Sequence, residues 1–74
     1  MIPQSVLDQC EFKPGDVVRL KDGDGRKHTI KDFDWNASRY TYFAIVIFED
    51  NASTGFIDYN CETGDWNESI IKII

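Results

Sequence analysis

The chain has 74 residues, of which 42% are hydrophobic and 14% aromatic. This length closes one hydrophobic core and excludes a second domain, while the apolar content excludes intrinsic disorder. The 13 acidic residues outnumber the 8 basic residues, and the net charge of −5 opposes the phosphate contacts on which nucleic-acid binding depends.

A short helical turn is expected within residues 1–11, packed on the rest of a single domain that spans residues 1–74. Pro3 is tolerated at the start of a helix, and Val6, Leu7 and Cys10 fall on one side of the turn. A helix this short is not stable alone, so its apolar side must be buried against the domain.

Two strands are predicted in the first half of the chain. A turn signal at residues 12–16 precedes an alternating strand at 17–21, where Val18 and Leu20 lie on one face. Two glycines within residues 22–25 then allow a tight reversal, and a β-branched strand follows at 27–33.

Three more strands are predicted in the second half. A polar loop at 34–38 leads to residues 40–48, which are almost all aromatic, β-branched or apolar and are typical of a central strand. The remaining segments are a turn at 49–53, a strand at 54–59, a loop at 60–68 and an apolar strand at 69–74. Five short strands separated by turns predict a mainly β domain, either a small barrel or a strongly bent sheet.

The central strand is unusual because it is apolar on both faces from Phe43 to Phe48. A half-buried strand alternates apolar and polar residues, so a second element is expected to cover the additional apolar face. Two candidates are the N-terminal turn, with Val6 and Leu7, and a second copy of the chain.

The opening of the β region carries a family resemblance. The segment from Phe12 to Gly23, which contains Gly15-Asp16-Val17-Val18, and its continuation from Gly25 to Ile30 are similar to the start of the small bacterial YodC-like proteins. Residues 46–50 and 70–73 resemble the later strand, acidic turn and apolar tail of that family. The resemblance implies a five-stranded SH3-like barrel and brings no known catalytic residues. The Gly-Asp-Val-Val opening is also similar to KOW-type and Tudor-like barrels.

The aromatic side chains suggest where a partner would bind. SH3-like folds recognise extended peptides on a shelf of aromatic residues beside acidic loops. The predicted partner-binding residues are Trp35, Tyr40, Tyr42, Tyr59 and Trp66. Acidic residues that favour a basic partner are Asp32, Asp34, Glu49, Asp50, Asp58 and Asp65. The first hypothesis is therefore a protein-interaction or accessory module, and packing of the aromatics in the core or at its rim is the alternative.

Two further hypotheses stay open. A KOW-like nucleic-acid or ribosome-associated module would use the basic residues Arg19, Lys21, Arg26, Lys27 and Lys31, although aspartates are interleaved with them. A self-associating structural protein would use the two-sided apolar strand.

An enzyme is not expected, because His28 is the only histidine and no nucleophile lies beside it in the sequence. A lone histidine in a strand is expected at the surface or an edge. No cofactor or metal is expected either, since the aspartates at 22–24 and 32–34 lack the remaining ligands of a calcium loop.

The two cysteines, Cys10 and Cys61, are expected as thiols with small, partly buried side chains, and a bridge between them is the alternative in an exported protein. No secretory signal and no apolar stretch of membrane-spanning length is recognised, so a cytoplasmic location is expected.

Overall fold

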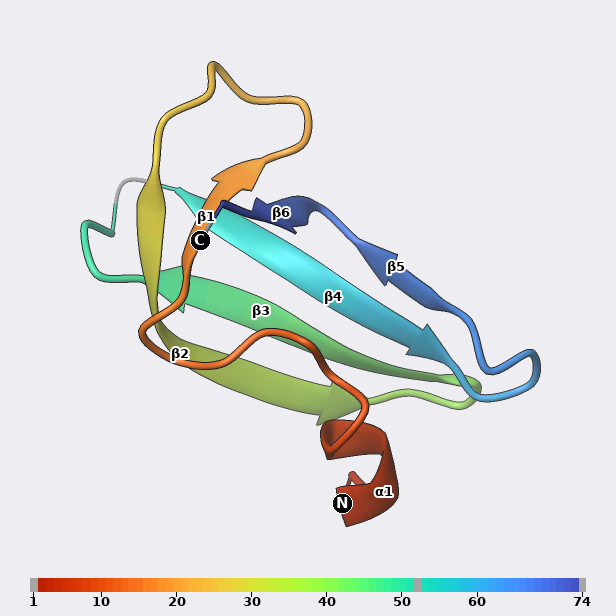
Figure 1. The fold of residues 1–74 in the computed structure, drawn as a ribbon. Coiled ribbons are helices and arrows are strands. Elements are labelled where there is room, and N and C mark those ends of the chain that lie inside the picture. The colour runs from red at the N-terminus through yellow and green to blue at the C-terminus, as the bar shows by residue number, and fades with distance from the viewer. Residues whose placement is uncertain (1, 52, 74) are drawn as a thin grey trace.

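The computed structural model describes residues 2–51 and 53–73. It contains one short helix and six strands (Figure 1). These elements are α1 (Gln4–Leu7), β1 (Val17–Leu20), β2 (His28–Ala37), β3 (Thr41–Phe48), β4 (Thr54–Asn60), β5 (Trp66–Glu68) and β6 (Ile70–Lys72). The prediction of a mainly β domain is confirmed. Within the described ranges, no helix is both long and apolar enough to cross a lipid bilayer.

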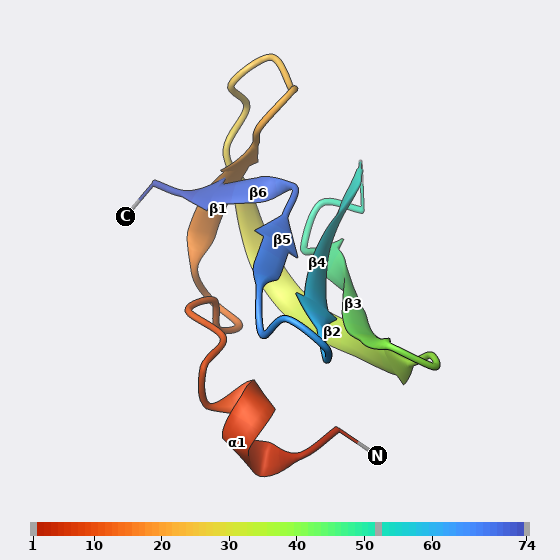
Figure 2. The same cartoon turned by 90° about the vertical axis from the view of Figure 1, so that its right-hand side faces the viewer.

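All six strands belong to one antiparallel sheet in the order β5-β4-β3-β2-β1-β6. The long strands β2, β3 and β4 lie side by side, while the β1–β6 pair crosses near one end of them (Figures 1 and 2). The described residues form an open sheet of six strands where five were expected, and the closed barrel implied by the family resemblance stays a prediction.

The two ends of the sheet meet at Ser69, which lies between β5 and β6. Its N–H donates to the carbonyl of Phe56 on β4 at 3.0 Å, and its carbonyl accepts from the N–H of Lys21, which follows β1, at 2.9 Å. The chain therefore passes from pairing with β4 to pairing with β1 at a single residue.

Two segments expected as loops are in fact strand, and those expectations are wrong. β2 continues through Ala37 because Asn36 and Ala37 pair with Phe43 and Tyr42 of β3. Its polar residues 34 and 36 point outward on a strand that buries the other face, which is normal for an antiparallel sheet. The predicted loop at 60–68 contains β5, which is held by pairing with β4 rather than by its own apolar content.

The core lies between β1, β6 and the inner face of β2–β4. Its residues that are at most 2% exposed are Phe12, Val18, Ile30, Ala44, Val46, Phe48, Ile57 and Ile70. Ala44, Val46 and Phe48 alternate along β3, as a strand with one buried face requires.

The helix α1 lies at the end of the sheet away from β6 (Figure 2). Val6 is buried, and Leu7 and Cys10 line the same small pocket as Phe33 and Trp35, which pack against the core. The expected packing of the turn on the domain therefore takes place on the inner side. The turn does not provide the cover expected for the outer side of β3.

Gly55 allows β4 and β6 to approach closely. A Cβ atom built at this position would lie 2.7 Å from Cγ2 of Ile70 and 3.2 Å from Oγ of Ser69. Both neighbours belong to the segment that joins the ends of the sheet, so a side chain at position 55 would force them apart.

We predict that Gly55→Ala lowers the free energy of unfolding by about 1–3 kcal/mol through overpacking, measured by urea denaturation. In a strand without such a contact, the same change is neutral or stabilising. The control is the double-mutant cycle with Ile70→Ala, which removes the contacting methyl group. An equal cost of Gly55→Ala in both backgrounds would show that the contact does not limit the packing.

Candidate functional site

The outer face of β2–β4 carries a row of apolar side chains. Antiparallel register places Ile45 of β3 opposite Phe56 of β4, and both are exposed, at 41% and 43%. Phe43 and Ile47 lie on the same face of β3 and are half-buried. These four residues, Phe43, Ile45, Ile47 and Phe56, are called the outer stripe.

Acidic side chains flank the outer stripe on both sides. On β2, Asp32 pairs with Ile47 and Asp34 pairs with Ile45. On β4, Asp58 pairs with Phe43. Each partner in an antiparallel pair points to the same face, so the three carboxylates border the apolar row. The outward positions paired between these strands, at 32–36, 43–47 and 54–58, carry no basic residue.

Three of the five predicted aromatic residues are brought together, but on the inner side of the sheet. The rings of Tyr42 and Tyr59 stack at 6.3 Å, and those of Tyr59 and Trp66 lie 4.9 Å apart. Trp35 packs against the core beside Phe33. Trp35, Tyr42, Tyr59 and Trp66 are all half-buried, so they are partly packing residues.

Tyr40 lies apart from the other predicted aromatics. It is in the turn between β2 and β3 and is 48% exposed, with the guanidinium of Arg39 5.1 Å from its ring centre. The predicted aromatic shelf is therefore not one surface. Tyr42, Tyr59 and Trp66 form a row on the inner side of the sheet, and Tyr40 lies in a turn. The prediction based on aromatic residues did not include the outer stripe. The sequence signal for the stripe was that residues 43–48 do not alternate between apolar and polar side chains.

The predicted basic cluster is spread over three places. Arg19 lies on β1, Arg26 and Lys27 lie in the following loop, and Lys31 occupies the irregularity where the β2–β3 register shifts. Asp24 lies among these basic residues. Its side chain accepts a hydrogen bond from the backbone N–H of Arg26 at 3.0 Å. This bond and the nearby guanidinium lower the pKa of Asp24.

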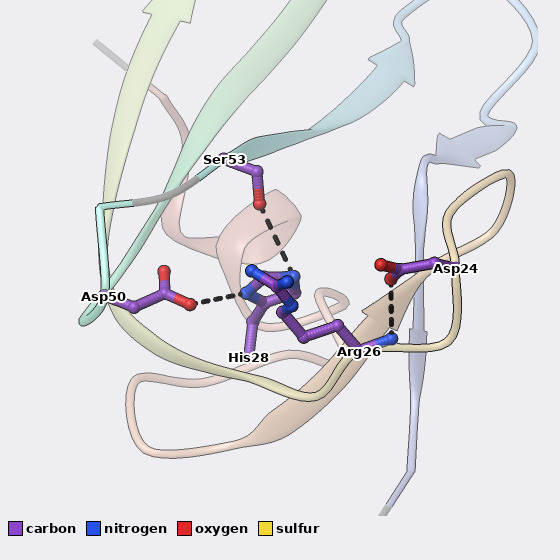
Figure 3. Close-up of polar contacts among 5 residues, drawn as sticks. All are labelled: Asp24, Arg26, His28, Asp50 and Ser53. Atoms are coloured by element: carbon purple, nitrogen blue, oxygen red, sulfur yellow. Dashed lines mark hydrogen bonds and ion pairs between the residues drawn. The ribbon is translucent and has the colours of Figure 1, made fainter.

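His28 is buried, so its expected surface position is wrong. Its side chain is 4% exposed and stacks on Phe48 with 4.6 Å between ring centres. Its Nδ1 lies 2.9 Å from Oδ2 of Asp50, and its Nε2 lies 3.4 Å from Oγ of Ser53 (Figure 3). The pairing of His28 with Val18 at the start of β2 carries the ring into the core.

The order Ser53–His28–Asp50 is the order of groups in serine-hydrolase triads. Here the imidazole is packed flat against the core, and the hydroxyl contact is long. Asp24, Arg26, His28 and Ser53 line one shallow pocket between the β1–β2 and β3–β4 connections. We interpret the three polar groups as a link that holds the β3–β4 connection on the start of β2.

The two cysteines are both free thiols, as expected. Cys10 is buried, and this burial raises the pKa of its thiol, while Cys61 is exposed rather than partly buried. Among residues 2–51 and 53–73, no three His, Cys, Asp or Glu side chains are grouped closely enough to hold a metal ion.

Comparisons of this chain with protein-family models, with curated proteins and with solved structures found no match. The resemblance to the YodC-like family therefore stays an expectation.

We predict that His28→Ala lowers the free energy of unfolding by about 2–4 kcal/mol, because it leaves a cavity against Phe48. His28→Phe retains the stacked ring and should cost less. Ser53→Ala removes only a long contact and should cost less than about 1 kcal/mol. The measurement is urea denaturation monitored by circular dichroism. A negligible cost for His28→Ala would contradict the structural role assigned to the ring.

Proposed function

We propose that this chain is a small, non-enzymatic protein-interaction module that docks a partner on the outer stripe. The observation that carries the proposal is the direct pairing of two exposed apolar side chains, Ile45 and Phe56, in the middle of a sheet face. Scattered exposed apolar residues are ordinary, but a contiguous apolar patch rimmed by polar groups is typical of a binding surface.

The charges around the stripe select the kind of partner. Asp32 and Asp34 border it on β2, and Asp58 borders it on β4. A partner segment with apolar residues in the centre and Lys or Arg on both sides would bury the stripe and neutralise this border. Opposite charges across an interface raise the association rate and exclude wrongly charged partners.

The same charges disfavour a second copy as the partner. Two outer stripes in contact would bring two acidic borders together, in a chain whose net charge is already −5. Like charges placed opposite one another cost free energy that apolar contact must offset. The acidic border also repels the phosphates of a nucleic acid.

We propose that the sheet is an SH3-like barrel, supported by the meeting of its two ends at Ser69. We place the domain in the cytoplasm, since a reducing compartment is consistent with the two free thiols.

The test uses two synthetic peptides with the same alternating leucines, one with lysines and one with glutamates at the intervening positions. Titrations are followed by amide NMR shifts. We expect the lysine peptide to perturb the strands around Ile45 and Phe56, with affinity that falls as salt increases. The glutamate peptide should leave them unchanged.

We predict that Ile45→Thr or Phe56→Thr weakens binding of the lysine peptide about tenfold or more, as expected for central apolar contacts. The matched control is Ile73→Thr, which alters another exposed apolar side chain away from the stripe and should leave the affinity unchanged. Equal affinity in all three variants would disprove the site. A dimer of the wild type that dissociates in Ile45→Thr, detected by light scattering, would instead assign the stripe to self-association.

A further inference from the structure

A separate cavity lies on the inner side of the domain, beside β5. Its volume is about 210 Å³, it is open to solvent, and it is lined by the segment Gln9–Phe12 and by Ile57, Trp66 and Glu68. Figure 2 shows β5 between β4 and the chain that leads from α1 to β1. The cavity is thus bordered by one edge of a short strand.

The edge of β5 that points away from β4 carries backbone groups that the sheet does not use. The N–H of Asn60 donates to Asp65 and that of Ser69 donates to Phe56, so residues 65, 67 and 69 direct their backbone groups to β4. Alternation directs the N–H and C=O of Trp66 and Glu68 to the opposite side. No other hydrogen bond among the described residues uses these groups. Such an edge can accept one more strand.

Two carboxyl groups meet at the wall of the cavity. The side chains of Glu11 and Glu68 both line it, so two acidic groups border the same small space. Burial first, and then the neighbouring carboxyl group of Glu11, raise the pKa of Glu68, while Lys21 acts in the opposite direction. The charge of Glu68 in turn helps to raise the pKa of Cys10, another residue of the wall. A cation placed between the two carboxylates would relieve their repulsion.

Trp66 provides an aromatic wall whose position is fixed. Its ring packs on Tyr59, and its Nε1–H donates to Oε1 of Gln9 at 3.4 Å, which connects β5 to the segment on the far side of the cavity. An indole ring is the best aromatic surface for a Lys or Arg side chain.

We propose that this cavity binds an extended, basic peptide segment of a partner protein. The segment adds to the edge of β5 through backbone hydrogen bonds to Trp66 and Glu68. One Lys or Arg side chain of the segment lies between the carboxylates of Glu11 and Glu68, against the ring of Trp66. This site is distinct from the outer stripe. It binds a partner through backbone hydrogen bonds at a strand edge, whereas the stripe binds through side chains on a sheet face.

The probe is a capped pentapeptide, Val-Thr-Lys-Thr-Val, titrated into the full chain and followed by NMR. We expect shifts of the Trp66 indole N–H and of the amides at 66–68. Norleucine in place of the lysine should weaken binding about tenfold or more, because a charge-assisted hydrogen bond is lost. Methylation of the peptide backbone nitrogens should abolish binding, because strand addition requires their N–H groups.

The variants Glu68→Gln and Glu11→Gln should each weaken binding of the lysine peptide about tenfold. Glu11 is exposed, so its substitution leaves the fold intact even if Glu68→Gln perturbs it. The matched control is Glu62→Gln, the same change at an exposed turn residue, which should leave the affinity unchanged. Unchanged affinity in both cavity variants, or equal binding of the norleucine peptide, would overturn the proposal. Shifts confined to Ile45 and Phe56 would also overturn it, while supporting the outer stripe.

The raised pKa of Glu68 gives the site a defined pH dependence. Glu68 must lose its proton to receive a cation, so binding of the lysine peptide should strengthen as pH rises through the raised pKa of Glu68 and should release a proton. The norleucine peptide should show no such dependence. Calorimetry in two buffers with different ionisation enthalpies measures the proton released, and binding of the lysine peptide without proton release would contradict the arrangement.

The unbound domain should show the opposite trend in stability. Because the folded-state pKa of Glu68 is raised, the folded state holds more protons than the unfolded state between the ordinary and the raised value. The contribution of Glu68 to stability is therefore present at low pH and is lost as pH rises through the raised pKa. The free energy of unfolding of Glu68→Gln minus that of wild type should increase as pH rises from the ordinary carboxyl pKa through the raised pKa of Glu68. A pH-independent difference would contradict the raised pKa.

Discussion

The architecture depends on the hydrogen bonds of Ser69. Its backbone N–H binds Phe56 on β4, its carbonyl binds Lys21 after β1, and its hydroxyl oxygen accepts from the N–H of Phe56 at 2.8 Å. One residue thus fixes the last segment both to β4 and to the end of β1. The same junction presses Ile70 toward Gly55, so hydrogen bonding and core packing support each other at this point.

The two candidate surfaces follow from the alternation of side chains on the same strands. On β4, Phe56 and Asp58 point outward to the stripe and its acidic border, while Ile57 and Tyr59 point inward to the core and the aromatic row. A shift of register by one residue would exchange the two sets. The chemistry of both surfaces therefore depends on the β3–β4 register, and each can be tested without altering the other.

The sequence predicted the elements whose own residues specify them. The alternation of Val18 and Leu20 and the apolar run at 43–48 identified β1 and β3. The excess of apolar residues in that run indicated a second apolar face, which was expected to be covered and is partly exposed. Elements specified by distant partners were missed: β5 is polar and short, and it forms because β4 is beside it. The contacts of His28 were also out of reach, since they join residues 22 and 25 positions apart. The five aromatics were assigned to one shelf because strand order, which separates Tyr40 from Trp66, is not a local property.

The position of β5 and β6 at the edges of the sheet has a consequence during synthesis. A ribosome releases β1, β2, β3 and β4 before these two strands, so the emerging sheet has β1 and β4 as its exposed edges. Unpaired edges can associate with other chains. The edges of β1 and β4 remain open to wrong pairing until residues 66–72 emerge, and that short segment covers both of these long-lived edges at once.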